Sequence, residues 1–329
     1  MTEFDLIEAL RARVNLRRDD VALGIGDDAA VLDVPPGTQL VACTDTMVEG
    51  VHFLEGTDAA DLGWKSLAVN LSDLAAMGAE PAWALLALTL PEPDSKFVEG
   101  FGQGFAELAA RHRVALVGGD TTQGPLSVTV TALGTVLRGT ALTRGGARIG
   151  DAVFVTGTLG DGAGALHLIR DSGPGTRDRD KQAALRSQST LFQRMHRPEP
   201  RVAVGLALRG IASACIDISD GLLADLGHVC TASGVAAELD LDAVPVSAEL
   251  RAQFDGAACL EFAMTGGDDY ELCFTAPAER ESAIAAALAQ AGCHATRIGR
   301  IVAGAGVRVL DAKGGRIDTP NVGWEHFSR

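Results

Sequence analysis

The sequence of 329 residues has no paired cysteine motif, no excess of basic charge and no long apolar run. Its six cysteines are scattered singly without a CxxC pair, so we expect no zinc site, redox pair or disulfide framework. Acidic residues outnumber basic ones by 43 to 28, and the formal charge of −15 works against binding nucleic acid or an anionic membrane. The longest apolar stretch, around residues 83–90, is far shorter than the roughly 20 residues that cross a bilayer.

Common catalytic motifs are also missing. No HExxH, GxSxG or kinase catalytic-loop sequence occurs. The glycine-rich stretch 157–164 is not followed by Lys-Ser/Thr, so it is not a Walker A loop, and we expect a tight turn between a strand and a helix. The N-terminus carries early acidic residues and predicts an amphipathic helix rather than a signal peptide. These features favour a cytoplasmic globular protein.

The length and the apolar pattern predict a two-lobed α/β (α+β) protein. At roughly 150 residues per domain, two domains are expected, and the glycine-rich segment 139–150 separates two compact halves. We therefore predict an N-terminal α/β domain at 1–140 and a C-terminal α/β domain at 141–329, with a loop at 171–181. The predicted strands cover 39–46, 83–90, 114–117, 126–137, 151–156, 214–218, 236–239, 271–275 and 307–310. The predicted helices cover 61–77, ended by Pro81, and 95–111, 221–232 and 279–290.

The segment Gly24-Ile25-Gly26-Asp27-Asp28-Ala29 formally matches a dinucleotide-binding fingerprint, but its context does not fit one. The preceding strand is short, and Pro35-Pro36 interrupts the helix that should follow. Two carboxylates about 4 Å apart repel each other by about 4 kcal/mol at an effective dielectric of 20. A polar turn with solvated acids is one interpretation, and a divalent cation that turns this repulsion into ligation is the other.

Aspartates recur at the ends of predicted strands and helices. Asp45 lies at the end of the strand predicted at 39–46, and Asp73 lies on a predicted helix, on the same face as Asn70. Asp120 follows two glycines, whereas Asp217 and Asp220 lie together in one short Asp-Ile-Ser-Asp-Gly segment. Each aspartate alone is explained by a helix cap or a turn. Together they offer the oxygen-rich, sulfur-free ligands that magnesium prefers.

Seven segments, taken in order, are similar to a known family: GIGDDAAVL, TDTMVEGVHF, NLSDLAAMGAEP, GGDTT, LTRGGARIGD, DISDGLLADLGH and GGDDYELCF. The sequence resembles the thiamine-monophosphate kinase family, within the aminoimidazole ribonucleotide synthetase-like superfamily. The similarity runs from about Gly24 to the Gly-Trp-Glu-His-Phe segment at 323–327, which is nearly the whole chain. Any one of these segments is a weak signal, but seven in the family's order are specific.

The resemblance implies a fold, ligands and partners. It implies ATP and several Mg²⁺ ions bound between the two lobes, and a homodimer whose N-terminal sheets form a barrel-like interface. The implied metal ligands are Asp28, Thr44, Asp45, Asp73, Asp120, Asp217 and Asp220, the ATP contacts are Gly119, Arg144 and Ser219, and the thiamine monophosphate contacts are His52, Asp268 and Trp324. Two positions depart from the family pattern: Cys43 replaces a serine, and Asp268 replaces the glutamate of GGEDYEL.

The implied reaction fits the absence of a catalytic base motif. A phosphate oxygen of thiamine monophosphate would attack the γ-phosphorus of ATP, and a phosphomonoester is mostly ionised at neutral pH because its second pKa is near 6. The main obstacle is then repulsion between two polyanions, which magnesium ions relieve. Three alternatives stay open: an aminoimidazole ribonucleotide synthetase, a selenophosphate synthetase, and a non-catalytic nucleotide- or metal-binding subunit.

Overall fold

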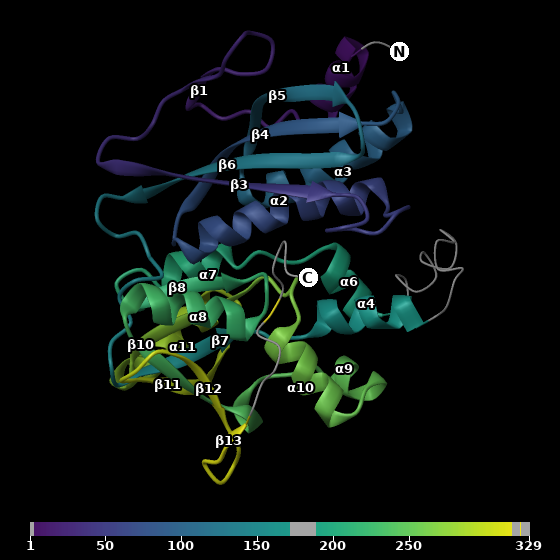
Figure 1. The fold of residues 1–329 in the computed structure, drawn as a ribbon. Helices are drawn as coiled ribbons and strands as arrows, with labels where there is room; N and C mark the ends of the chain where they lie inside the picture. The colour runs from purple at the N-terminus through teal and green to yellow at the C-terminus, as the bar shows by residue number, and fades with distance from the viewer. Residues whose placement is uncertain (1–2, 172–188, 318–322, 324–329) are drawn as a thin grey trace. The chain divides into compact units, whose positions relative to one another are not determined.

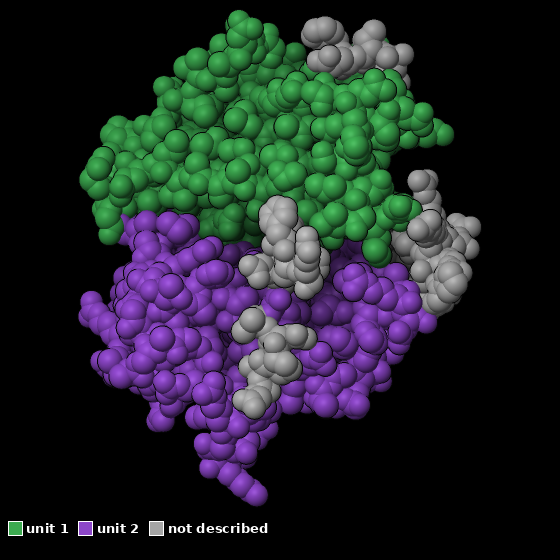
Figure 2. All heavy atoms as spheres, viewed as in Figure 1, with its two compact units in different colours: residues 1–74, 79–139, 177–180 green, residues 75–78, 140–176, 181–329 purple. Residues whose placement is uncertain are grey.

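The structure is a computed structural model that describes residues 3–171, 189–317 and 323. The described residues form two compact units, coloured separately in Figure 2. Unit 1 comprises residues up to 74 together with 79–139, and unit 2 comprises residues 75–78 and the described residues from 140 onward. The fold class predicted from the sequence is confirmed, because both units combine helices with a mixed β-sheet.

Unit 1 is built on a four-stranded sheet with the strand order β3-β6-β4-β5, in which only the β4–β5 pair is parallel (Figure 1). Its strands are β3 (Thr38–Val48), β4 (Glu80–Leu90), β5 (Ala115–Gln123) and β6 (Ser127–Leu137), with β1 (Val21–Leu23) and β2 (Val31–Leu32) in a separate ribbon. Its helices are α1 (Glu3–Arg13), α2 (Ala59–Ala76) and α3 (Ser95–His112). The long helices arise from regularly spaced leucines and phenylalanines, which are fully buried in this unit.

One face of this sheet is covered by helices, whereas the other face is open except near Trp83, where the β1–β2 ribbon packs against it. On β6, Val128 and Val130 are buried, and the alternate residues Thr129 and Thr131 are half-buried. The helical face is identified by Cys43 on β3, whose Sγ lies 3.3 Å from the backbone oxygen of Asn70 on α2. The open face carries pairs of hydrogen-bonded threonines on neighbouring strands.

Unit 2 is built on a seven-stranded sheet with the order β13-β12-β9-β11-β7-β10-β8. Its strands are β7 (Asp151–Thr156), β8 (Ala214–Ile218), β9 (Ala236–Asp240), β10 (Glu271–Pro277), β11 (Ala295–Val302), β12 (Gly306–Leu310) and β13 (Arg316–Ile317). Its helices are α4 (Asp161–Asp171), α6 (Thr190–His196), α7 (Val202–Ala207), α8 (Leu222–Ser233), α9 (Ala248–Gln253), α10 (Gly256–Thr265) and α11 (Glu281–Gln290), with 3₁₀ turns η1 (Leu241–Ala243) and η2 (Ala278–Arg280). The interior strand β7 is buried at all six positions.

The structure corrects three predicted elements. Pro81 does not end the first long helix, which stops at Ala76. Pro81 instead lies inside β4, where the pairing with β6 is irregular because proline cannot donate a hydrogen bond. Strand β5 continues through Gly119 and Asp120 instead of turning there. Strand β3 extends to Val48, so Asp45 lies within a strand rather than at its end.

The expected turn between a strand and a helix is confirmed, but it covers only 157–160, because α4 already begins at Asp161. Of the predicted loop at 171–181, the structure describes only residue 171, which is the last residue of α4. The other residues of this predicted loop lie outside the described residues. Among the described helices, none is long and apolar enough to cross a membrane.

Candidate functional site

In unit 2, a single buried carboxylate holds the turn 219–221, which joins β8 to α8. This turn carries two predicted site residues, Ser219 and Asp220, and a third, Asp217, lies just before it at the end of β8. Asp225 on the first turn of α8 accepts hydrogen bonds at 3.1 Å from the backbone amides of Ser219, Asp220 and Gly221. Burial, and then the negative charges of Asp217 and Asp220, raise the pKa of Asp225 to about 7. Asp225 was not predicted as a site residue, although an aspartate on the buried face of an apolar helix is itself a signal.

The segment Gly266–Tyr270 lies directly against this loop. The amide of Asp268 donates to the Ser219 carbonyl at 2.9 Å, and the amide of Tyr270 donates to the Ile218 carbonyl at 2.8 Å. A Cβ atom at Gly267 would lie 2.5 Å from the Ser219 oxygen, so this close approach requires glycine. The structure therefore brings Ser219, a predicted ATP contact, next to Asp268, a predicted substrate contact.

The predicted ATP contact Arg144 lies on a loop that is held by the other end of α8. The Ser233 hydroxyl donates to the Arg144 carbonyl at 3.1 Å and accepts from the amides of Gly146 and Ala147, also at 3.1 Å. The carbonyl of the preceding residue, Thr143, accepts a hydrogen bond from the β8 backbone at 3.0 Å. Helix α8 thus fixes two of the three predicted nucleotide-binding segments, while the Arg144 side chain stays exposed.

In unit 1, Asp45 and Asp73 come together around Cys43. Burial raises the pKa of the Cys43 thiol, and the charges of Asp73 and Asp45 raise it further, so the thiol keeps its proton. The two carboxylates come from β3 and from α2, on the helical side of the sheet. The structure therefore places these two carboxylates, which come from different segments, near the same thiol.

The remaining predicted ligands of unit 1 lie elsewhere. The Thr44 hydroxyl bonds to Thr131 on the open face at 3.0 Å, so only the Thr44 backbone can join a site beside Asp45. Asp120 pairs in register with Ala87 on the open face, and two strands separate β5 from β3, which amounts to roughly 14 Å. Asp28 lies in an exposed turn, where its amide donates to Asp27 at 2.8 Å.

The structure also shows the local surroundings of two further predicted site residues, Gly119 and His52. A Cβ atom at Gly119, which has φ of 154°, would lie 1.8 Å from the Leu86 carbonyl oxygen, so the sheet itself requires glycine there. The Nδ1 atom of His52 accepts a hydrogen bond from the Val48 amide at 3.0 Å. An accepting Nδ1 carries no proton, so the proton of the neutral ring lies on Nε2. Trp324 lies outside the described residues.

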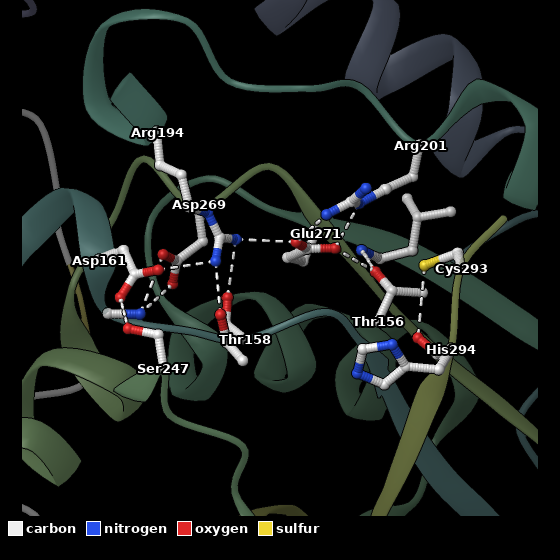
Figure 3. Close-up of polar contacts among 12 residues, drawn as sticks. Thr156, Thr158, Asp161, Arg194, Arg201, Ser247, Asp269, Glu271, Cys293 and His294 are labelled. Atoms are coloured by element: carbon white, nitrogen blue, oxygen red, sulfur yellow. Dashed lines mark hydrogen bonds and ion pairs between the residues drawn. The ribbon is translucent and has the colours of Figure 1, made fainter. Parts of the chain in front are cut away.

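A buried ionic network lies beside the 266–270 segment (Figure 3). Glu271, which is 1% exposed, accepts from Arg194 at 2.8 Å, from Arg201 at 2.7 Å and from the Thr156 hydroxyl at 2.6 Å. The neighbouring Asp269 is buried and accepts from the Gly160 amide at 2.9 Å, and burial raises its pKa well above the usual range. These residues were not predicted as site residues from the sequence.

Within the described parts of the chain, three or more His, Cys, Asp or Glu side chains are nowhere grouped closely enough to hold one metal ion. Carboxylates do act in pairs on a common neighbour: Asp45 and Asp73 both raise the pKa of Cys43, and Asp217 and Asp220 both raise the pKa of Asp225. Magnesium commonly binds through one or two carboxylates and completes its shell with substrate phosphates and water. Such pairs therefore fit magnesium held jointly with a phosphate ligand.

Comparisons with known proteins give one consistent result. Residues 26–136 match the N-terminal domain of AIR synthase related proteins, and residues 148–312 match the C-terminal domain. Thiamine-monophosphate kinase of Salmonella typhimurium is 47% identical over 92% of this chain and 90% of its own length. The crystal structure of thiamine-monophosphate kinase from Stenotrophomonas maltophilia is 50% identical, with a TM-score of 0.84 over 94% of this chain and 96% of that one. A structure described as AaThiL complexed with AMPPCP and TMP is 34% identical, with a TM-score of 0.75 over 99% of this chain and 97% of that one.

Proposed function

The chain belongs to the thiamine-monophosphate kinase family, and on that premise we propose the reaction that it catalyses. It transfers the γ-phosphoryl group of ATP to the phosphate of thiamine monophosphate, which gives thiamine diphosphate and ADP in the last step of thiamine diphosphate biosynthesis. The observation that carries this proposal is identity of 47% over nearly the full length of a thiamine-monophosphate kinase. The contact between Ser219 and Asp268 supports it, because an ATP contact and a substrate contact belong side by side in such an enzyme.

The side chains bind and orient the substrates and supply no general base. The acceptor phosphate is mostly ionised at neutral pH, so it needs no deprotonation. His52 has its proton on Nε2, and this N–H is a donor for a substrate phosphate oxygen. Asp268 and Trp324 bind the thiamine portion, and Gly119, Arg144 and Ser219 bind ATP.

The carboxylate and backbone oxygens of both units are ligands that suit magnesium. Asp45 and Asp73 would hold it in unit 1, and Asp217 and Asp220 would hold it in unit 2. The other proposed ligands are the carboxylates of Asp28 and Asp120 and the backbone oxygen of Thr44. Bound magnesium ions neutralise the phosphates and stabilise the charge of a loose transition state. The charges of the two aspartate pairs support the assignment, because Asp45 and Asp73 raise the pKa of Cys43, and Asp217 and Asp220 raise the pKa of Asp225.

We also propose a cytoplasmic homodimer that pairs the open faces of two unit 1 sheets. This face carries Leu40, Leu85 and Leu137, which are 50%, 37% and 59% exposed. Exposed leucines on one side of a sheet favour burial against a second copy. The six cysteines are free thiols, as is usual in a reducing compartment. The net charge of −15 argues against nucleic acid as a partner.

The test is ATP turnover by the purified chain with thiamine monophosphate and Mg²⁺, with thiamine diphosphate detected by chromatography. Formylglycinamidine ribonucleotide and selenide serve as competing acceptors, because each is the substrate of an alternative superfamily member. Thiamine diphosphate should form only with thiamine monophosphate, ATP and Mg²⁺ present, and excess EDTA should stop it. Turnover of another acceptor, or no turnover at all, would overturn the proposal.

A further inference from the structure

The segment that carries Asp268 has a strained backbone. Asp268 has φ of 68° and Tyr270 has φ of 51°, and among the described residues only one other non-glycine residue, Arg113, has a positive φ. Residues other than glycine rarely adopt a positive φ, and a bulky residue such as tyrosine is especially unfavourable there. Such strain persists only where the surrounding structure imposes it, and it is concentrated at functional sites.

This strain is imposed by two sets of contacts, those of the neighbouring side chains Asp269 and Glu271 and those of the backbone amides of Asp268 and Tyr270. Asp269 is held by the Gly160 amide, and Glu271 by the arginines of the buried network (Figure 3). The amides of Asp268 and Tyr270 are bonded to the carbonyls of Ser219 and Ile218. The backbone is therefore fixed from two sides, and the positions of the Asp268 and Tyr270 side chains follow from it.

A hydrogen bond joins these two side chains directly. The Tyr270 hydroxyl donates to Asp268 Oδ1 at 2.7 Å. Tyr270 is 8% exposed and is the single tyrosine of the chain, whereas Asp268 is half-buried. A buried phenol thus restrains a partly accessible carboxylate. This bond restricts the rotation of the aspartate side chain about χ1 and χ2.

We propose that Tyr270 is a positioning residue for thiamine monophosphate, and that it acts by fixing the Asp268 carboxylate. This inference rests on the proposed function. A carboxylate repels the phosphate of the substrate, so its partner is the cationic thiazolium–aminopyrimidine portion. Aspartate has a shorter side chain than the glutamate of the family pattern, so its reach depends on where the backbone and Tyr270 hold it. The Tyr270 bond fixes that carboxylate before the substrate binds, so less conformational freedom is lost on binding.

The test compares Tyr270→Phe with a matched loss of another hydroxyl, Thr156→Val. Both variants remove a hydroxyl that donates to a carboxylate, but Thr156 donates to Glu271 instead of Asp268. Tyr270→Phe should raise the KM for thiamine monophosphate roughly tenfold, with kcat and the KM for ATP within about twofold of the wild type. Thr156→Val should lower the Tm and leave the KM for thiamine monophosphate within about twofold.

A double-mutant cycle with Asp268→Ala shows whether Tyr270 acts through Asp268. In the Asp268→Ala background, Tyr270→Phe should change the KM for thiamine monophosphate by less than about twofold. Equal effects of Tyr270→Phe and Thr156→Val on this KM, an equal rise in the KM for ATP, or an undiminished effect in the Asp268→Ala background would overturn the inference alone. A wild type without turnover or calorimetric binding of thiamine monophosphate would overturn both the inference and the proposed function.

Discussion

The two units present their predicted site residues in opposite ways. In unit 1, Asp45 and Asp120 lie within long strands, on different faces of a sheet, and Asp28 lies in an exposed turn. In unit 2, Asp217 lies at the end of a strand, and the other described site residues lie in loops that contacts from α8 or β8 hold in place, above all the bonds of the buried Asp225. Unit 1 therefore supplies carboxylate oxygens that only a metal ion or a substrate could bring into one site. Unit 2 supplies loops whose backbone is already held in place before any ligand binds.

This difference predicts different costs for mutation. Replacing a donor in unit 1 should affect ligand binding and spare the fold, because sheet pairing and leucine packing stabilise that unit. Replacing a network residue in unit 2 should destabilise the fold first, because it leaves buried charges without partners. Four predictions test this contrast.

The largest effect is expected for Asp45→Asn and Asp120→Asn in unit 1. Each change removes a proposed ligand charge but little volume, so kcat/KM should fall roughly a thousandfold, as when one transition-state donor is lost. The Tm should stay within a few degrees of the wild type, and the Mg²⁺ concentration for half-maximal activity should rise. The exposed Asp33→Asn is the matched control and should change neither quantity. Near-normal activity in both variants, or a large loss of Tm, would remove the contrast between the units.

A large effect on stability is expected for Glu271→Gln in unit 2. This change leaves Arg194 and Arg201 facing a neutral partner, and breaking a buried ion pair costs about 3 kcal/mol of unfolding free energy. Glu99→Gln is the control, because Glu99 pairs with Arg13 at 3.0 Å with both side chains about half exposed. The control should cost less than about 1 kcal/mol in urea denaturation. Equal losses in the two variants would show that the network is not a special source of stability.

A smaller effect, on association, is expected for Leu85→Arg on the open face of unit 1. A charge in the proposed dimer interface should weaken the dimer more than tenfold, measured as the concentration dependence of the molar mass in sedimentation equilibrium. Ile149→Arg is the control, since Ile149 is 66% exposed in unit 2. A wild-type chain that is monomeric at all concentrations would contradict the homodimer, and equal weakening by both variants would contradict the open face as its interface.

The sequence predicted the elements whose pattern is local. Alternation of Val128 and Val130 with threonines gave β6 and its two faces, because side chains alternate along a strand. Strand β11 was missed because Arg297, Gly299 and Arg300 interrupt its apolar pattern. The continuation of β5 was missed because two glycines resemble a turn, whereas Gly119 is needed for the close approach to β4.

The residues of the candidate site also fall into a local group, which the sequence predicted, and a non-local group, which it did not. Its motif residues were recognisable because the family resemblance preserves them in short segments. The supporting residues were not, since their partners are far away in the sequence: Arg201 and Glu271 are 70 residues apart, and Arg194 and Glu271 are 77 apart. Asp225 bonds to backbone amides four to six residues earlier, which no side-chain pattern reveals. A strained φ at Asp268 and Tyr270 likewise follows from tertiary contacts alone.

The smallest expected effect is a pH dependence of opposite sign in the two units. In unit 1, hydrogen bonding to Arg18 lowers the pKa of Asp20, so its contribution to stability is present above the unfolded value near 3.8 and is lost as the pH falls through the folded pKa. In unit 2, burial raises the pKa of Asp269, so its contribution is present below the unfolded value and is lost as the pH rises through the folded pKa.

Acidification should therefore first strengthen unit 2, between neutral pH and about 4, and then weaken unit 1 below about 4. The measurement is differential scanning calorimetry in EDTA across this range, on the wild type, Asp20→Asn and Asp269→Asn. Asp20→Asn should lower the free energy of unfolding by about 1 kcal/mol at neutral pH, because the charge that Arg18 stabilises is gone. It should also remove the contribution of this residue to the loss of stability below pH 4. Asp269→Asn should flatten the gain on acidification from neutral pH, since an amide does not titrate. The same sign of pH dependence at both positions would mean that the Asp269 carboxyl is ionised beside Arg194, and that both units stabilise their acids as charged groups.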